Sequence, residues 1–170
     1  SNRIVDGYVR PVAWRGAEQM GVSAQENKIH LALACWDWPA YFSPEARAKG
    51  IRMLWSRWAR PAPHTAPVHA KASGLYMICT MAKHEAEAQG CDDALMLDWR
   101  GNLAEGTGAN LFLAINGELH TPTPDCFLNG ITRQTVICLA KARGIKFIER
   151  AIMPAELAKA DDMFLTGSAA

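Results

Sequence analysis

The chain has 170 residues, of which 49% are hydrophobic and 21% charged, a composition typical of a globular domain with a core. The formal net charge of +1 and the lack of any run of lysines or arginines argue against nucleic acid as a partner. The apolar stretches are too short to span a bilayer and no leader-like segment opens the chain, so we expect a cytoplasmic protein with no membrane partner.

The cysteines and histidines do not suggest a metal site. The five cysteines are odd in number and contain no Cys-x-x-Cys pair, which favours reduced, buried thiols over a disulfide framework or a zinc site. The five histidines show no metal-ligand spacing. We therefore predict no bound metal.

The N-terminal half predicts short elements separated by prolines and glycines. Residues 8–23 are predicted to form a short strand followed by an extended segment. The run Ile29 to Ala34 is apolar enough to be a core strand, and Ser43-Pro44 is typical of a helix start. Residues 51–58 alternate as a strand with one exposed face would, and the proline-rich residues 60–67 indicate a rigid loop.

The C-terminal half mixes helices with hairpins. Asn116-Gly117, between two apolar runs, predicts a two-residue hairpin turn. Few β-α-β alternations occur, so we expect an α+β domain with a mixed, largely antiparallel, barrel-like sheet and flanking helices. The predicted helices are 74–89, 130–143 and 154–159, and the predicted strands are 93–98, 103–105, 110–115, 118–121, 145–148 and 163–166.

Lys71 is the first candidate for chemistry. It lies between two alanines and just ahead of Ser73-Gly74, where the backbone could approach a flat ligand closely. A lysine in a partly desolvated site has a lowered pKa and can form a Schiff base with an aldehyde such as pyridoxal phosphate. Taken alone, a surface lysine before a helix is the more common interpretation.

Two further stretches could serve such a ligand. Glu105 precedes Gly106 and Gly108, which would allow close backbone approach, and its carboxylate could lie beneath a pyridine ring and keep the ring nitrogen protonated. Residues 128–133 open a predicted helix whose free N–H groups suit a phosphate, and residues 166–169 could add a hydroxyl and two amides. A loop acid and an ordinary capped helix remain the alternative interpretations of these stretches.

Together, four ordered motifs resemble the large domain of class IV (fold-type IV) pyridoxal-phosphate aminotransferases, most closely the branched-chain amino-acid aminotransferases. The resemblance runs from Tyr8 to Ala170, and four motifs in order are more specific than any one of them. They are Lys71 to Tyr76 (Lys-Ala-Ser-Gly-Leu-Tyr), Glu105 to Phe112 (Glu-Gly-Thr-Gly-Ala-Asn-Leu-Phe), Leu128 to Arg133 (Leu-Asn-Gly-Ile-Thr-Arg) and Thr166 to Ala170 (Thr-Gly-Ser-Ala-Ala).

The resemblance implies a role for each cofactor residue. Lys71 would be the Schiff-base lysine and the proton shuttle, Tyr76 would hydrogen-bond the phenolic oxygen of pyridoxal 5'-phosphate, and Glu105 would contact its pyridine nitrogen. Leu128 would lie against the ring. The phosphate would be held by Ile131, Thr132, Gly167 and Ser168.

The resemblance also implies the substrates. The opening Tyr8-Val-Arg-Pro11 with Met20-Gly-Val22 is similar to the segment that forms the substrate pocket of branched-chain enzymes. Tyr8 and the amides of Ser168 and Ala169 would bind carboxylate, and Arg10 would bind the side-chain carboxylate of glutamate. Trp38 would wall an apolar pocket for leucine, isoleucine or valine. Val22 would reach a neighbouring subunit, so a homo-oligomer is implied, with amino acids and 2-oxo acids, including 2-oxoglutarate, as small-molecule partners.

The family also carries a small N-terminal domain and a further C-terminal segment, for which we find no counterpart here. We therefore expect residues 1–22 to be an interdomain segment ending a missing small domain, and residues 23–170 to be a large cofactor-binding domain truncated at its C-terminus. Such a fragment alone would be inactive. D-amino-acid transaminase and aminodeoxychorismate lyase, which share the fold, and a non-catalytic relative remain alternatives.

Overall fold

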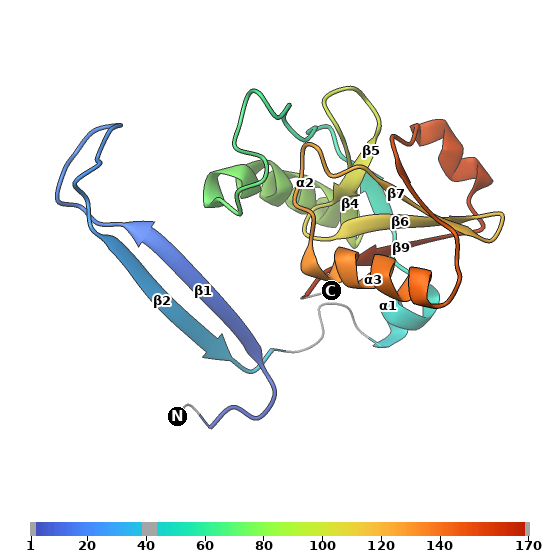
Figure 1. Cartoon of the computed structure of the whole chain (residues 1–170), viewed down its shortest axis with the longest axis horizontal. Coiled ribbons are helices and arrows are strands. Elements are labelled where there is room, and N and C mark those ends of the chain that lie inside the picture. The colour runs from blue at the N-terminus through green and yellow to red at the C-terminus, as the bar shows by residue number, and fades with distance from the viewer. Residues whose placement is uncertain (1–2, 39–43, 169–170) are drawn as a thin grey trace. The chain divides into compact units, whose positions relative to one another are not determined.

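The computed structural model describes residues 3–38 and 44–168, which form two compact units (Figure 1). The first unit holds residues 3–38 and the second residues 44–168, and each is described by itself. Among the described residues, no helix is both long and apolar enough to cross a membrane. The assignment of residues 1–22 to an interdomain segment and of residues 23–170 to a large domain stays a prediction.

The first unit is a two-stranded antiparallel ribbon, drawn blue in Figure 1. Strand β1 (Tyr8–Arg15) pairs with β2 (Ile29–Trp36) in a register that runs from Tyr8 opposite Trp36 to Arg15 opposite Ile29. The prediction of a core strand here is wrong for this unit, since Ile29, Leu31 and Leu33 are 67–70% exposed. Two paired strands enclose no interior, so apolar composition alone does not bury them.

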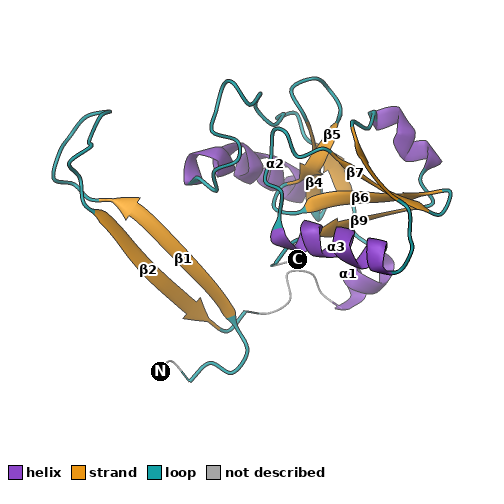
Figure 2. Cartoon of the chain, viewed as in Figure 1, coloured by secondary structure: helices purple, strands orange, loops and turns teal. Residues whose placement is uncertain are grey.

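The second unit is built on a seven-stranded mixed sheet, drawn in orange in Figure 2. The strand order is β3-β4-β5-β6-β7-β8, and β9 pairs with β6. Pairs β3/β4 and β7/β8 are parallel, whereas the other four pairs are antiparallel, so the predicted α+β class with a largely antiparallel sheet is confirmed. The bounds are β3 (Met53–Trp55), β4 (Asp93–Leu97), β5 (Leu103–Gly106), β6 (Asn110–Ile115), β7 (Glu118–Pro122), β8 (Phe147–Arg150) and β9 (Asp162–Thr166).

The helices flank this sheet. The predicted helix over 74–89 begins as the 3₁₀ turn η1 before it continues as α2, whose apolar stripe of Cys79, Ala82 and Ala86 is buried. The predicted helix over 154–159 is a 3₁₀ helix, and the strand predicted over 51–58 is reduced to β3. The bounds are α1 (Pro44–Lys49), η1 (Ser73–Tyr76), α2 (Met77–Ala88), α3 (Ile131–Ala142) and η2 (Pro154–Lys159).

The core lies on β4, β5 and β6. The main apolar cluster consists of Leu95, Leu103, Leu111, Leu113, Ile115 and Ile152.

Two local predictions can be checked against the second unit. The predicted turn between β6 and β7 is confirmed, because Asn116 and Gly117 have φ angles of +51° and +76°, as a type I′ hairpin requires. The thiols follow the prediction only in part, since Cys79 and Cys126 are buried whereas Cys138 is exposed.

Candidate active site

Lys71 follows the proline-rich loop and lies two residues before η1. Its Nζ donates a hydrogen bond to the hydroxyl of Tyr76, at 2.8 Å, so the first motif folds back on itself to bring an amine and a phenol together. The expectation of a partly desolvated amine is not met, because Lys71 is exposed in the structure. Its short neighbours, Ala72 and Ser73, leave the amine uncovered within the described residues.

Glu105 lies in strand β5, not in a loop between hairpins, and is buried. Burial raises the pKa of its carboxyl to about 8, and the positive charges of Arg60 and Lys71 oppose that rise. The carboxyl is therefore close enough to the Lys71 amine for the two charges to interact. A buried acid whose pKa is shifted by burial and by charged partners is a candidate for a functional site.

Arg60 is a site residue that the sequence did not reveal. It is 5% exposed, and its Nε lies 3.4 Å from Oε1 of Glu105, while its Nη1 donates to Sγ of Cys79 at 3.3 Å. The Nε has no hydrogen-bond partner with good geometry among the described residues. Its sequence context, before Pro61 in a proline-rich loop, indicates only extended backbone. The burial of Arg60 depends on a long-range contact, because its backbone N–H donates to the carbonyl of Leu97 in β4.

Gly106 is packed within the unit, and the expected approach of a ligand at Gly108 stays a prediction. A Cβ on Gly106 would lie 3.1 Å from Oδ2 of Asp93 and 3.2 Å from Cδ1 of Leu165, so this glycine serves internal packing. A Cβ on Gly108 would meet nothing within 4 Å. The close packing of the second motif is therefore directed at the sheet.

Three neighbouring strands align the acid with the C-terminal motif. In the ladder, Glu105 of β5 is opposite Asn110 of β6, and Asn110 is opposite Thr166 of β9. The chain leaves β9 at Gly167, and the hydroxyls of Ser168 and Thr132 lie 3.4 Å apart. Antiparallel pairing thus brings residues more than 30 positions apart to one edge of the site.

The N-terminus of α3 forms the other side of this edge. Gly130 is the N-cap, so the N–H groups of Ile131 and Thr132 in the first turn have no carbonyl of the helix to bond. With the two hydroxyls, they form a group of donors suited to an anion. The side chain of Ile131 is 79% exposed and Leu128 is half-buried. Gly167 is half-buried and Ser168 exposed, whereas Ala169 lies outside the described residues.

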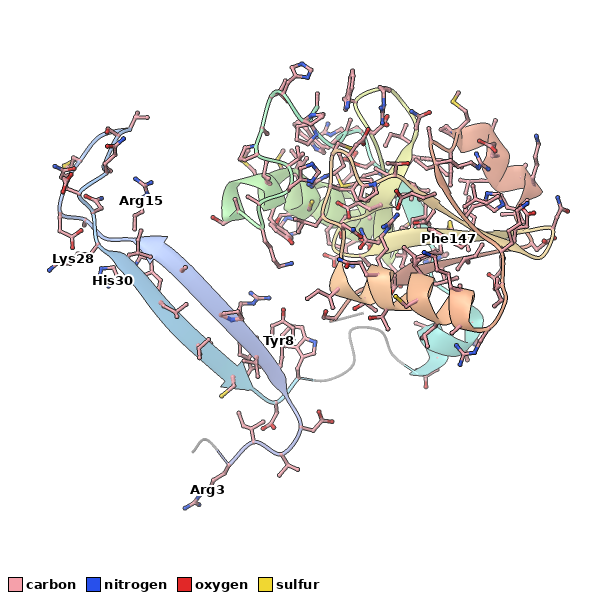
Figure 3. All side chains as sticks on the ribbon, viewed as in Figure 1. Arg3, Tyr8, Arg15, Lys28, His30 and Phe147 are labelled. Atoms are coloured by element: carbon pink, nitrogen blue, oxygen red, sulfur yellow. The ribbon has the colours of Figure 1, made fainter. Side chains whose placement is uncertain are left out.

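Four of the predicted substrate residues, Tyr8, Arg10, Val22 and Trp38, belong to the first unit. Tyr8 and Trp38 have ring centroids 5.6 Å apart, and the guanidinium of Arg10 lies 5.2 Å from the Tyr8 ring centroid. Figure 3 shows Tyr8 at one end of the ribbon and Arg15 and Lys28 at the other, which begin and end the connection that holds Val22. The ribbon therefore gathers Tyr8, Arg10 and Trp38 but not Val22, which is fully exposed.

Comparison with known proteins identifies the family. The model of the amino-transferase class IV family matches residues 1–170. The chain is 39% identical to a branched-chain-amino-acid aminotransferase of Pseudomonas aeruginosa over 169 residues, which are 99% of this chain and 55% of that protein. The chain thus spans about half the length of the curated relatives it matches.

Solved structures agree. The Escherichia coli branched-chain amino acid aminotransferase has a TM-score of 0.92 at 37% identity, covering 96% of this chain and 54% of that one. An aminotransferase from Brucella abortus, bound to the co-factor PLP, has a TM-score of 0.83 at 35% identity and covers 96% of this chain and 57% of that one. Both the family match and these similarities extend over nearly all of the sequence. The chain therefore belongs to the class IV aminotransferase family.

Proposed function

We propose that the whole protein is a pyridoxal 5'-phosphate-dependent aminotransferase that moves the amino group between branched-chain L-amino acids and 2-oxoglutarate. The observation that carries this proposal is the buried Glu105, flanked by Arg60, with its carboxyl near the Lys71 amine. The similarity to the branched-chain enzyme of Pseudomonas aeruginosa supports the choice of substrates.

The residues of the second unit fit the cofactor. The acid has a pKa raised by burial, so it would be stabilised as a carboxylate by a cationic N–H group, such as that of a protonated pyridine ring. The two hydroxyls and the free amides of the first α3 turn would hold a phosphate. When bound, pyridoxal phosphate supplies an aldehyde that joins an amine and a ring that withdraws electrons from the substrate α-carbon.

Lys71 would join the cofactor and also move the proton. Its Nζ, once unprotonated, would accept the proton of the substrate α-carbon. The hydroxyl of Tyr76, which accepts a hydrogen bond from this Nζ, would limit the positions that the amine can take. Leu128, half-buried before α3, would supply an apolar surface beside the flat ring.

Glu105 and Arg60 would set the charge beneath the ring. Arg60 favours the ionised form of Glu105, because an opposite charge in a buried site lowers the pKa of an acid. Neutralising the acid would leave the ring nitrogen without an anionic partner. The pair would therefore act on electron withdrawal rather than on cofactor retention.

Substrate choice would fall to the first unit and to the end of the chain. Arg10 would bind the side-chain carboxylate of glutamate, while Trp38 would accept the aliphatic side chains. Tyr8 and the amides of Ser168 and Ala169 would bind carboxylate. We further propose a cytoplasmic homo-oligomer in which Val22 reaches the neighbouring subunit.

Substitution of Lys71 tests the proposal directly. Wild type with added pyridoxal phosphate should develop a visible absorbance band and, after borohydride reduction, a covalent adduct on Lys71 seen by peptide mass spectrometry. Lys71→Ala should lose both with little change in melting temperature, because the side chain is exposed. Lys141→Ala, at an exposed lysine of α3, is the matched control and should retain both.

A covalent adduct in Lys71→Ala would refute this assignment. The class of substrate is tested separately, by supplying leucine, isoleucine, valine, glutamate and D-alanine as amino donors to wild type. Turnover of D-alanine in preference to the branched-chain L-amino acids would instead indicate D-amino-acid transaminase.

A further inference from the structure

Asn110 lies between Glu105 and the first turn of α3 and bonds both. It is 6% exposed and is the first residue of β6, opposite Glu105 in the ladder. Its Nδ2 donates to Oε2 of Glu105 at 3.1 Å and to the carbonyl of Leu128 at 3.0 Å. Its Oδ1 accepts the N–H of Gly130 at 3.2 Å. One amide group therefore uses both donor hydrogens and its acceptor on two different parts of the site.

The chemistry of these contacts is specific for asparagine. Two of the partner atoms, on Glu105 and Leu128, are acceptors and the third, on Gly130, is a donor. A carboxylate of the same shape would place an oxygen where Nδ2 lies, facing both acceptors, and would lose two hydrogen bonds. Alanine would leave a buried acid and a carbonyl without this partner, which is costly for buried polar groups.

Gly130 is fitted to the same side chain. A Cβ at this position would lie 2.5 Å from Oδ1 of Asn110, well inside contact distance. The backbone of Gly130 has a φ of −58° and a ψ of 147°, which any residue can adopt. Space beside Asn110, not backbone conformation, is therefore what requires a glycine here.

The turn is also held from its other side. Arg133, 1% exposed, donates to Oδ1 of Asn129 at 2.8 Å and to the carbonyl of Pro122 at 3.0 Å. Arg133 fixes the first turn of α3 to the end of β7 but does not bond Glu105. Within the described part of the chain, the hydrogen bonds that join the turn to Glu105 run through Asn110.

We propose that Asn110 is a positioning residue that fixes the Glu105 carboxylate and the first turn of α3 relative to each other. One side chain would then set the distance between the ring end and the phosphate end of the cofactor site. This inference rests on the proposed function, since that function supplies the ligand whose two ends are matched.

The first test compares pyridoxal phosphate with pyridoxal, which lacks the phosphate. The dissociation constant of pyridoxal divided by that of pyridoxal phosphate, each measured by absorbance titration of the whole protein, is the ratio of interest. It reports how well the phosphate end is aligned with the ring end. Asn110→Ala should reduce this ratio roughly ten-fold or more, as loss of a residue that orients a ligand group typically does. Asn110→Asp should be at least as damaging, although it fills the same space.

A second variant covers the case in which Asn110→Ala does not fold. Gly130→Ala should displace the amide from its Oδ1 side and reduce the ratio as well. Lys141→Ala, at an exposed residue near the end of α3, is the control and should leave the ratio unchanged. A role in stability alone predicts lower melting temperatures with an unchanged ratio in Asn110→Asp and Gly130→Ala, and that result would overturn the proposal.

The second test needs no cofactor and separates this inference from the proposed function. Glu105→Gln should shift the amide proton resonance of Gly130 in the ¹H–¹⁵N spectrum, because Asn110 contacts both residues. In an Asn110→Ala background the same substitution should leave that resonance in place. No shift in wild type, or an equal shift in both backgrounds, overturns the link. Failure of wild type to bind pyridoxal phosphate would instead refute the proposed function, and the link would still be decided by these spectra.

Discussion

The buried acid should make the stability of the protein fall with pH, and Glu105→Gln should remove that fall. Burial raises the pKa of Glu105 to about 8 from an ordinary value of 4.5. Between these values the folded protein keeps a proton that the unfolded chain has released. The unfolding free energy therefore decreases as pH rises, by at most about 1.4 kcal/mol per pH unit. This contribution is fully present below pH 4.5 and is lost as pH approaches 8.

The magnitude is large enough to measure. Over two pH units inside this window, from about pH 5.5 to about pH 7.5, the acid should cost the wild type roughly 2–3 kcal/mol that Glu105→Gln does not lose. Urea unfolding at three pH values, without cofactor, gives the difference between the two proteins at each pH. Glu87→Gln, with 56% of its side chain exposed, is the control and should follow the wild type. Parallel wild-type and Glu105→Gln stabilities across the window would refute this account of the acid.

Three further predictions concern the same charges and the substrate. Arg60→Met should destabilise the protein more at about pH 8.5 than at about pH 6, because the ionised acid then loses its buried partner, and adding Glu105→Gln should abolish that difference in urea unfolding. In the loaded enzyme, Glu105→Gln should lower kcat for leucine far more than it weakens pyridoxal phosphate in an absorbance titration, and an unchanged kcat would mean that the acid is structural. Arg10→Met should lower kcat/KM for glutamate roughly ten- to hundred-fold more than for leucine, and equal losses would mean that Arg10 only shapes the ribbon.

Local chemistry explains what the sequence predicted correctly. The Asn116-Gly117 turn and the burial of Cys79, Ala82 and Ala86 on one helix face depend on residues within one or two turns of each other. Such signals need no knowledge of distant partners. The ladder that aligns Glu105 with Thr166 has no comparable local signal. The motifs that contain these two residues could therefore be recognised in the sequence, but their positions relative to each other could not be predicted.

The errors share a physical origin in long-range packing. The strand from Ile29 to Trp36 is apolar, but exposure is decided by what covers it, and the partner strand covers only its edge. The expected desolvation of Lys71 is wrong for the same reason. Small neighbouring residues cannot bury an amine, so burial would have to come from distant segments, and Lys71 is exposed. Arg60 was missed because a buried arginine is recognised by its partners, and Glu105 lies 45 residues further along the chain.

The two units divide the proposed chemistry in a way that bears on specificity. The groups assigned to the cofactor lie in one hydrogen-bonded unit, where Asn110 bonds Glu105 and the α3 turn and the ladder fixes β9. Tyr8, Arg10 and Trp38 lie in the first unit, with β1 and β2. Under the proposed function, substitutions at Arg10 or Trp38 would change which side chain is accepted. A change at Asn110 or Arg60 should instead affect every substrate alike, because all of them would use the same acid.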